Sequence, residues 1–374
     1  MPEPHPALLQ LILAGGATGP RRALLDMHDC PARALAAGPS AWRAAGLSAA
    51  QIQAYLQPEP AQLQLALAWL QAPRHHLVGW QDPDYPALLR QAGSPPLGVF
   101  VDGDPSRLWH PGVAMVGSRA PSAGGRDNAA AFARAFSRSG LSVISGLAAG
   151  IDGAAHRATL AAGGVTVAVL GTGPDLAYPR SHAELRQQIA ETGAVVSEHA
   201  PGTPARPGHF PGRNRIIAGL ALGTLVVEAA ERSGALITAR LAGEAGREVF
   251  ALPGSIHNPM ARGCHRLIRE GVGLVETPEE VIAALAPVAT ELGAALRGRL
   301  EASGSRPHTG YRAVHPSPDP AHKQLWLALG HDPTGMDSLA ERTGLTTAEL
   351  SSMLLAMELD GRVTVEHGRY SRKS

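Results

Sequence analysis

The stretch HFPGRNRIIAGL at residues 209–220 places an aromatic ring, Phe210, close to two arginines, Arg213 and Arg215. No acidic residue occurs between Glu198 and Glu228. Fixed positive charge neutralises phosphates, and an aromatic face stacks on an unpaired base with about 1–3 kcal/mol. The alternative is that Phe210 is a core residue beside arginines that pair with acids at the end of a sheet. The residue types leave both interpretations open.

A second charge-segregated stretch is GSRAPSAGG at residues 117–125. Between Asp104 and Asp127 the chain has arginines but no acid. If Gly117 ends a strand and a helix follows, Ser118 and the next amides lie at a helix N-terminus, which attracts anions. Arg119 adds a charge-assisted hydrogen bond to a phosphate. The alternative is that Gly117 only permits a tight turn.

Other patterns give little support for an enzyme. Asp152 and His156 are four residues apart, a spacing that puts a carboxylate and an imidazole on one helix face. No nucleophile accompanies them, so a helix cap and a buried hydrogen bond explain them better. Neither GSRAPSAGG nor GTGPDL matches the dinucleotide pattern G-x-G-x-x-G. Cys30 and Cys264 have no metal or disulfide spacing. We therefore expect no catalytic residue, no cofactor and no metal.

The middle of the chain alternates short apolar runs with alanine-rich helical segments. Each apolar run has the length of a buried strand, and several end in glycine where a ligand crevice opens. The pattern predicts an α/β fold, a Rossmann-like parallel sheet covered on both faces, over residues 80–285. The expected strands are VAMVGSR, LSVISG, VTVAVLG, AVVSEH, TLVVEAA, EVFALPG and GLVET.

Smaller segments flank this domain. Residues 1–75 are predicted to form a helical module that is loosely similar to sterile-alpha-motif or helix-hairpin-helix units. Residues 286–321 are rich in Gly, Ser, Pro and Arg and are expected to be a linker. Residues 322–374 predict a winged helix-turn-helix. The third of its three expected helices, the recognition-type helix at residues 346–360, carries acids and no Lys or Arg, so a protein contact is favoured over a DNA groove.

The composition limits the function classes. The 374 residues include 33 basic and 32 acidic side chains, for a net charge of +1. A uniformly basic protein is excluded, and any anion site must arise from local segregation of charge. The first residues, MPEPHPALLQLILAGG, lack a basic leader, and no apolar run approaches the roughly 18 residues of a membrane span. We expect a soluble, cytoplasmic protein without a membrane partner.

Six blocks of this sequence together resemble the DNA-processing protein A family (DprA, also called Smf). The resemblance covers roughly residues 80–280. It implies a Rossmann-like protein that binds single-stranded DNA in natural transformation, protects incoming strands and loads the RecA recombinase, without acting as an enzyme. The blocks are GSRAPSAGGRDNA, SGLAAGIDGAAHRATLAAGG, TVAVLGTGPDLAYP, HFPGRNRIIAGL, VVEAAERSGALITARLAGEAGREVFALPG and GCHRLIREG.

The resemblance also implies a DNA pocket at defined positions of this chain. The family often has a further basic residue just before the aromatic; here the nearest is Arg206, slightly further upstream. A pocket of this size holds only a few nucleotides, so we expect a homodimer in which two pockets engage one strand. The implied pocket residues are Gly117, Ser118, Arg119, Phe210, Arg213, Asn214, Arg215, Ser233 and Gly234.

The strongest enzyme alternative is a nucleoside-monophosphate phosphoribohydrolase on a related Rossmann fold. Such enzymes resemble this architecture but need a PGGxGTxxE loop, whose Glu assists glycosidic cleavage. The corresponding loop here is ERSGALITA, residues 231–239, which has no Glu after the turn.

Overall fold

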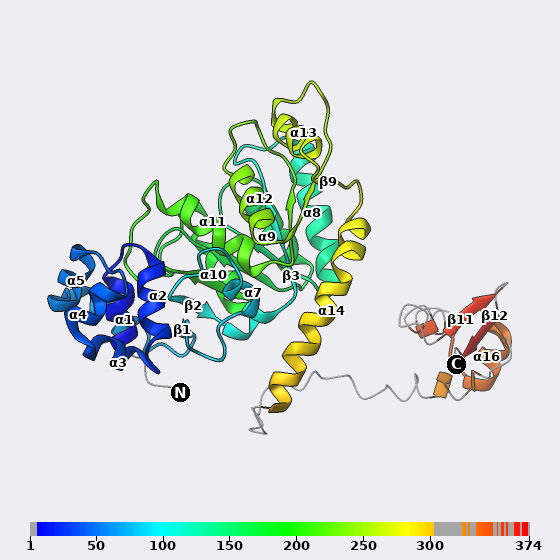
Figure 1. Ribbon diagram of the computed structural model, residues 1–374. Helices are drawn as coiled ribbons and strands as arrows, with labels where there is room; N and C mark the ends of the chain where they lie inside the picture. The colour runs from blue at the N-terminus through cyan, green and yellow to red at the C-terminus, as the bar shows by residue number, and fades with distance from the viewer. Residues whose placement is uncertain are drawn as a thin grey trace. The chain divides into compact units, whose positions relative to one another are not determined.

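The computed structural model describes residues 6–302 continuously and parts of the C-terminal segment. The described C-terminal residues are 324–326, 328–329, 334–346, 350, 353–354, 357, 363–366 and 369–372. The chain divides into two compact units, Met1–Ser303 and Gly304–Ser374 (Figure 1).

The first unit is built on a nine-stranded sheet in the order β1-β2-β6-β5-β4-β3-β7-β8-β9. Strands β3 to β9 pair in parallel, as expected for a Rossmann-like domain. Strands β1 and β2 pair antiparallel with each other, and β2 pairs antiparallel with β6. The strands are β1 His75–Gly79, β2 Gly98–Gly103, β3 Gly112–Val116, β4 Ser142–Ser145, β5 Thr166–Val169, β6 Ala194–Ser197, β7 Gly223–Val226, β8 Glu248–Ala251 and β9 Gly273–Leu274.

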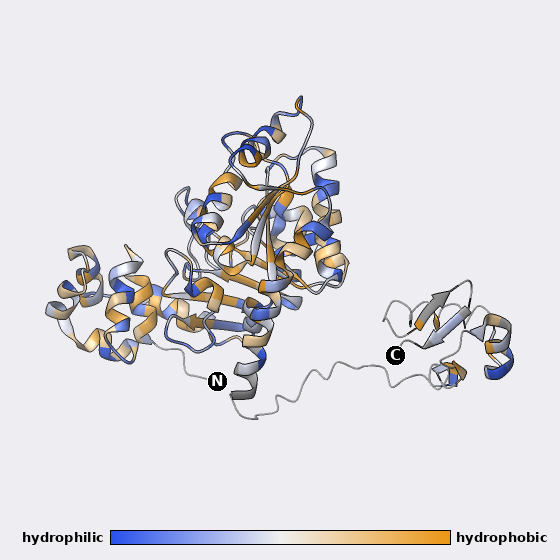
Figure 2. Ribbon diagram, turned by 45° about the vertical axis from the view of Figure 1, so that its right-hand side comes forward, coloured by the Kyte–Doolittle hydropathy of each residue, from blue (hydrophilic) through white to orange (hydrophobic). Residues whose placement is uncertain are grey.

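Helices cover both faces of this sheet. One core joins α8, α9 and α14 to the sheet, and another joins α11, α12 and α13 to its opposite face. Hydrophobic residues concentrate along the central strands, as Figure 2 shows. The helices are α7 Ala87–Arg90, α8 Ala123–Arg138, α9 Ile151–Ala161, α10 Ala183–Thr192, α11 His209–Leu220, α12 Ala235–Glu244, α13 Arg262–Arg269 and α14 Pro278–Ala302, with short 3-10 turns at Pro105–Trp109, Arg180–His182 and Pro259–Ala261.

The topology locates a ligand crevice. From β3 the chain builds β4, β5 and β6 outward on one side, and α11 then returns it to β7 on the other side of β3. At such a reversal of strand order, the loops after neighbouring strands leave in opposite directions and open a gap at the carboxyl ends. The crevice therefore lies beyond the ends of β3 and β7.

The N-terminal helices form a small core of their own. Arg21 is buried there and donates to the carbonyl oxygens of Leu11, Ile12, Gly16 and Ala17. The indole N–H of Trp80 donates to Asp26 at 2.7 Å, which joins this helical region to the end of β1. The helices are α1 Pro6–Leu13, α2 Thr18–Asp26, α3 Pro31–Ala36, α4 Gly38–Ala44, α5 Ala49–Leu56 and α6 Pro60–Trp69.

The expected linker begins as a helix, which corrects the prediction for residues 286–302. Helix α14 runs from Pro278 to Ala302 and includes Pro287. Val281, Leu285 and Leu292 are buried against the core that contains α8. Their spacing of four and seven residues puts them on one helix face, a signal that the glycine and proline content concealed. Residues 303–321 lie outside the described part of the chain.

The second unit contains a three-stranded antiparallel sheet and a helix, consistent with the expected winged helix. Its strands pair in the order β10-β12-β11 around an apolar core that includes Leu325, Leu339 and Leu354. The acids of the recognition-type helix, Glu349, Glu358 and Asp360, lie outside the described residues. The elements are β10 Thr334–Gly335, α16 Met336–Thr343, β11 Val363–Glu366 and β12 Arg369–Arg372.

Among the described residues, none of the helices combines the length and the apolar composition that crossing a bilayer requires.

Candidate nucleic-acid interface

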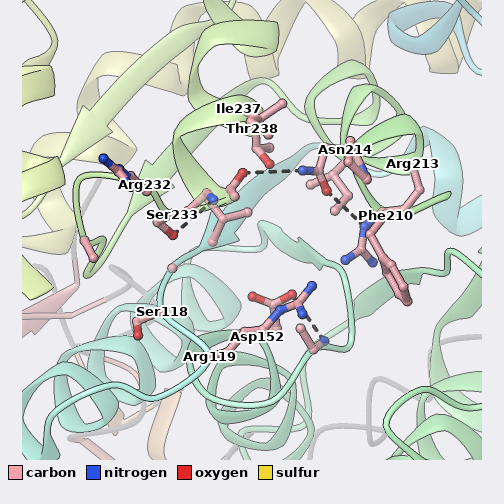
Figure 3. A pocket seen from close by; sticks show the side chains of 18 of the residues that line it. Ser118, Arg119, Asp152, Phe210, Arg213, Asn214, Arg232, Ser233, Ile237 and Thr238 are labelled. Carbon is pink, nitrogen blue, oxygen red and sulfur yellow. Dashed lines mark hydrogen bonds between the residues drawn. The ribbon is translucent and has the colours of Figure 1, made fainter. Parts of the chain in front are cut away.

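A cavity of about 790 Å³ opens at the carboxyl ends of β3 and β7. The turn after β3, the first turns of α11 and the N-terminus of α12 form its sides, and Figure 3 shows labelled side chains from all three segments around it. All but one of the predicted pocket residues line it. They are Gly117, Ser118, Arg119, Phe210, Arg213, Asn214, Ser233 and Gly234.

Arg119 lies at the mouth of this cavity and is exposed. Its guanidinium carbon is 5.6 Å from the centroid of the Phe210 ring. Within the described residues its guanidinium forms no ion pair and no hydrogen bond. A cation that packs on an aromatic face and has no ion-pair partner among the described residues is available for a phosphate.

Phe210 is half-buried in the second position of α11 and lines the cavity. Its ring centroid is 5.0 Å from that of Tyr178, with the ring planes at 42°. Gly171 provides room for the ring, because a β-carbon there would come within 3.0 Å of Phe210 Cδ1. The ring therefore stands at the edge of a cavity, which favours stacking over the alternative of a core phenylalanine.

Arg213 also lines the cavity, but its side chain is buried and satisfied internally. Its guanidinium donates to the carbonyl oxygens of Gly146, at 2.5 Å, and of Val169, and its Nε donates to Asn214 Oδ1 at 3.1 Å. Burial lowers the pKa of Arg213 to about 10, and the charge of Asp152 opposes this shift. Arg213 thus joins the ends of β4 and β5, whereas the sequence suggested a charge presented to phosphate.

Asp152 and His156 form their hydrogen bonds with different partners and not with each other. The Asp152 carboxylate accepts from the backbone N–H groups of Gly146, at 3.1 Å, and Ala148, at 3.3 Å. Burial raises the pKa of Asp152, and the charge of Arg213 opposes this. His156 Nδ1 is 2.7 Å from Thr166 Oγ1, and burial lowers the pKa of His156 to about 3. The structural explanation of this pair is therefore supported over a catalytic one.

The N-terminus of α8, expected to attract an external anion, already faces an acid of the chain itself. Glu228 accepts from the backbone N–H of Ser122 at 2.9 Å and from its hydroxyl at 2.5 Å. Asn258 Nδ2 donates to the same carboxylate at 3.0 Å. Ser118 is turned inward, and its hydroxyl accepts from the N–H of Ala120 at 3.1 Å. The prediction of an open anion site at this helix is therefore wrong.

Helix α12 also begins at the cavity, but its first backbone amides already have partners. Those of Ala235, Leu236 and Ile237 donate to Ser233 Oγ at 3.3 Å, to the Ser233 carbonyl at 3.2 Å and to the Gly234 carbonyl at 3.1 Å. Its first turn has no acidic residue, and its N-cap, Gly234, provides no side-chain cap. Arg232 is exposed just before it and lines the cavity. Thr238 is buried one turn further on, and within the described residues its hydroxyl forms no hydrogen bond. The helix dipole at this end and the charge of Arg232 favour an anion, such as a phosphate of a bound strand.

Arg215, which was predicted to join the pocket, and Arg206, whose role the sequence left open, both lie outside the cavity lining. Arg215 donates to Glu198 at 2.5 Å, and its side chain does not line the cavity. Arg206 is exposed and is also not among the lining residues. The sequence interpretation missed Tyr178 and Arg232, although Tyr178 follows the glycine-rich loop after β5. The rule that parallel strands end at one edge would have pointed to it.

Comparisons with known families agree with this architecture. The model of the family described as DNA recombination-mediator protein A matches residues 76–286. The chain belongs to the DNA recombination-mediator protein A family. The family's DprA winged helix domain matches residues 312–369, which supports the winged-helix prediction.

Relatives extend over most of the chain. Protein Smf from Escherichia coli (strain K12) is 40% identical over 328 residues, which are 87% of this chain and 85% of that protein. DNA processing protein DprA from Streptococcus pneumoniae is 46% identical over 202 residues, which are 54% of this chain and 71% of that protein.

Two solved structures of DNA processing protein A are similar to this one. The X-ray structure from Streptococcus pneumoniae has a TM-score of 0.66 and 36% identity, and the match covers 74% of this chain and 95% of that one. The structure from Helicobacter pylori has a TM-score of 0.52 and 25% identity, covering 57% and 96%. The latter is described as giving insight into a single-stranded DNA binding mode of that protein.

Proposed function

We propose that this protein binds single-stranded DNA during natural transformation, protects incoming strands and delivers them to the RecA recombinase. The observation that carries the DNA-binding part is Arg119, which has no ion pair in the described part of the chain and packs over the aromatic ring of Phe210 at the mouth of a cavity. Membership of the DNA recombination-mediator protein A family and the likeness to the Helicobacter pylori protein support it.

The preference for single strands follows from the kind of contact. A base stacks on Phe210 only when it is free of its neighbours in a duplex, and the cavity beside the ring accepts such a base. Arg119 and Arg232, which both line the cavity, supply positive charge for the adjoining phosphates. These contacts involve the phosphate backbone and the flat faces of the bases, which all four nucleotides share, so little sequence preference is expected.

We expect the protein to bind a single-stranded oligomer more tightly than a blunt duplex of equal length. Its affinity should fall steeply as salt is raised, because each neutralised phosphate releases counterions. A gel-shift series with single-stranded DNA, duplex DNA and RNA at several salt concentrations measures both. Equal affinity for the blunt duplex would contradict the proposed function.

The proposal includes no chemistry on the DNA. Of the carboxylates near the cavity, Asp152 accepts from two backbone amides, and Glu228 accepts from Ser122 and Asn258. Both are therefore occupied in the described structure, and the loop before α12 lacks the Glu of a phosphoribohydrolase. Incubation with nucleoside monophosphates should release no free base; release would favour the enzyme alternative.

We also propose a homodimer, because a single cavity of this size holds only a few nucleotides. When two cavities engage one strand, the second contact becomes intramolecular and the total affinity rises. A variant that no longer dimerises should therefore lose far more affinity for long oligomers than for very short ones. Light scattering and a length series of oligomers test this, and a monomer with tight binding of long strands would refute it.

A further inference from the structure

A second cavity, of about 390 Å³, adjoins the first. Both cavities are lined by Tyr178 and Phe210, so these two rings form part of the wall that they share. Arg119 also lines both. The second cavity is completed by Pro179 and Arg180, which follow Tyr178 directly along the chain.

Tyr178 has the properties of a contact residue rather than of a core residue. The residue is 46% exposed, although it carries a large aromatic ring. Within the described residues its hydroxyl forms no hydrogen bond, and its ring contact is with Phe210. A tyrosine held at the surface by one aromatic neighbour offers a flat face at low conformational cost.

Two arginines, Arg119 and Arg180, line the second cavity together with Tyr178. Arg180 is exposed at the start of the turn Arg180–His182, and in the described part of the chain it forms no ion pair. Arg119 lies on the Phe210 side of the ring pair. An aromatic surface in a cavity that is also lined by two arginines without an ion pair among the described residues matches a strand in which bases and phosphates alternate.

The rings themselves limit how bases can bind. With centroids 5.0 Å apart and planes at 42°, Tyr178 and Phe210 are in contact, so a base cannot enter between them. A base must instead stack against the pair from one cavity or from the other. Two successive bases can then lie on opposite sides of the wall.

We propose that the second cavity binds a nucleobase next to the one held at Phe210, with Tyr178 as its stacking surface and Arg180 beside the connecting phosphate. This inference rests on the proposed function, because it assumes a single-stranded ligand. It adds a requirement: tight binding needs two neighbouring bases.

The test compares two single strands of equal length, one of thymidines and one in which every second residue is abasic. The alternating strand has no neighbouring bases and cannot fill both cavities. We expect the wild-type protein to bind the contiguous strand about tenfold more tightly, the loss of one stacked base. We expect Tyr178→Ala to weaken binding of the contiguous strand by about tenfold and to abolish the preference.

Two variants serve as controls. Tyr178→Phe keeps the ring and should bind both strands as the wild-type protein does. Leu176→Ala removes an exposed apolar side chain from the same loop, outside both cavities, and should change neither affinity. Thermal unfolding of each variant checks that the fold is intact.

The outcomes separate this inference from the function on which it rests. If Tyr178→Ala binds the contiguous strand normally, or keeps the preference for it, while Phe210→Ala weakens binding, the second base site is refuted and the proposed function stands. If the wild-type protein binds neither strand, both are refuted.

Discussion

Replacing Arg213 with alanine is expected to lower the free energy of unfolding by about 2–5 kcal/mol, with loss of DNA binding as a secondary effect. The substitution removes the donors to two buried carbonyl oxygens, those of Gly146 and Val169. An unpaired buried acceptor costs about 1–3 kcal/mol, and the cavity left by the side chain adds to this. Urea unfolding of the wild-type protein and the variant measures the difference.

The stability lost in Arg213→Ala should also depend on pH, because the charge of Arg213 affects the pKa of Asp152. Burial raises the pKa of Asp152 above its ordinary value of 3.8, and the charge of Arg213 opposes the shift. An acid with a raised pKa in the folded state favours folding when protonated, and this contribution is lost as the pH rises toward its folded pKa. Without Arg213 the folded pKa rises further, so the destabilisation should be larger at neutral pH than near pH 4.

Two comparisons make the Arg213 prediction specific. Asp152→Asn in the Arg213→Ala background removes the uncompensated charge and should restore part of the stability at neutral pH. Arg240→Ala is the matched control, because Arg240 is exposed and its one ion pair among the described residues is with Glu244, one turn away, a contact worth about 0.3–0.5 kcal/mol. A fully stable Arg213→Ala protein that no longer binds DNA would instead assign Arg213 to phosphate contact.

The sequence was sufficient to predict which segments form the cavity. Parallel strands end at one edge, so the turn after β3, the start of α11 and the start of α12 could be expected to meet. The direction of each side chain was harder to predict. Arg213 and Arg215 are two positions apart on α11, and residues at that spacing do not share a helix face. Both cannot therefore face the cavity, and the structure turns Arg215 to Glu198.

Other differences between the predicted and the observed structure come from contacts between residues that are far apart in the sequence. The hydrogen bond from Ser122, at the N-terminus of α8, to Glu228 joins residues 106 positions apart, and no local sequence pattern indicates it. The antiparallel strands β1 and β2 need no crossover helix, so the alternation of strands and helices that predicted the rest does not include them. Local composition also concealed α14, where alanines and leucines continue past Pro287.

The position of Phe210 can be tested without removing its ring. Gly171→Ala adds a methyl group that would come within 3.0 Å of Phe210 Cδ1, so the ring must shift. We therefore expect this variant to reproduce part of the affinity loss caused by Phe210→Ala. The backbone of Gly171 is outside the left-handed region, so alanine brings no backbone strain of its own.

Phe210→Ala itself is expected to weaken single-stranded DNA binding by about 1–3 kcal/mol while the salt dependence stays nearly constant, because stacking releases no ions. Arg119→Ala should instead reduce the slope of affinity against salt by about one unit, and Arg138→Ala, an exposed arginine outside the cavity, should not. Since Arg119 contacts the Phe210 ring, the double variant should deviate from the sum of the single losses. Fluorescence titrations at several salt concentrations measure these quantities, and thermal unfolding accompanies each. If Phe210→Ala lowers the melting temperature by several degrees and keeps its affinity, the ring is a core residue and the stacking assignment is wrong.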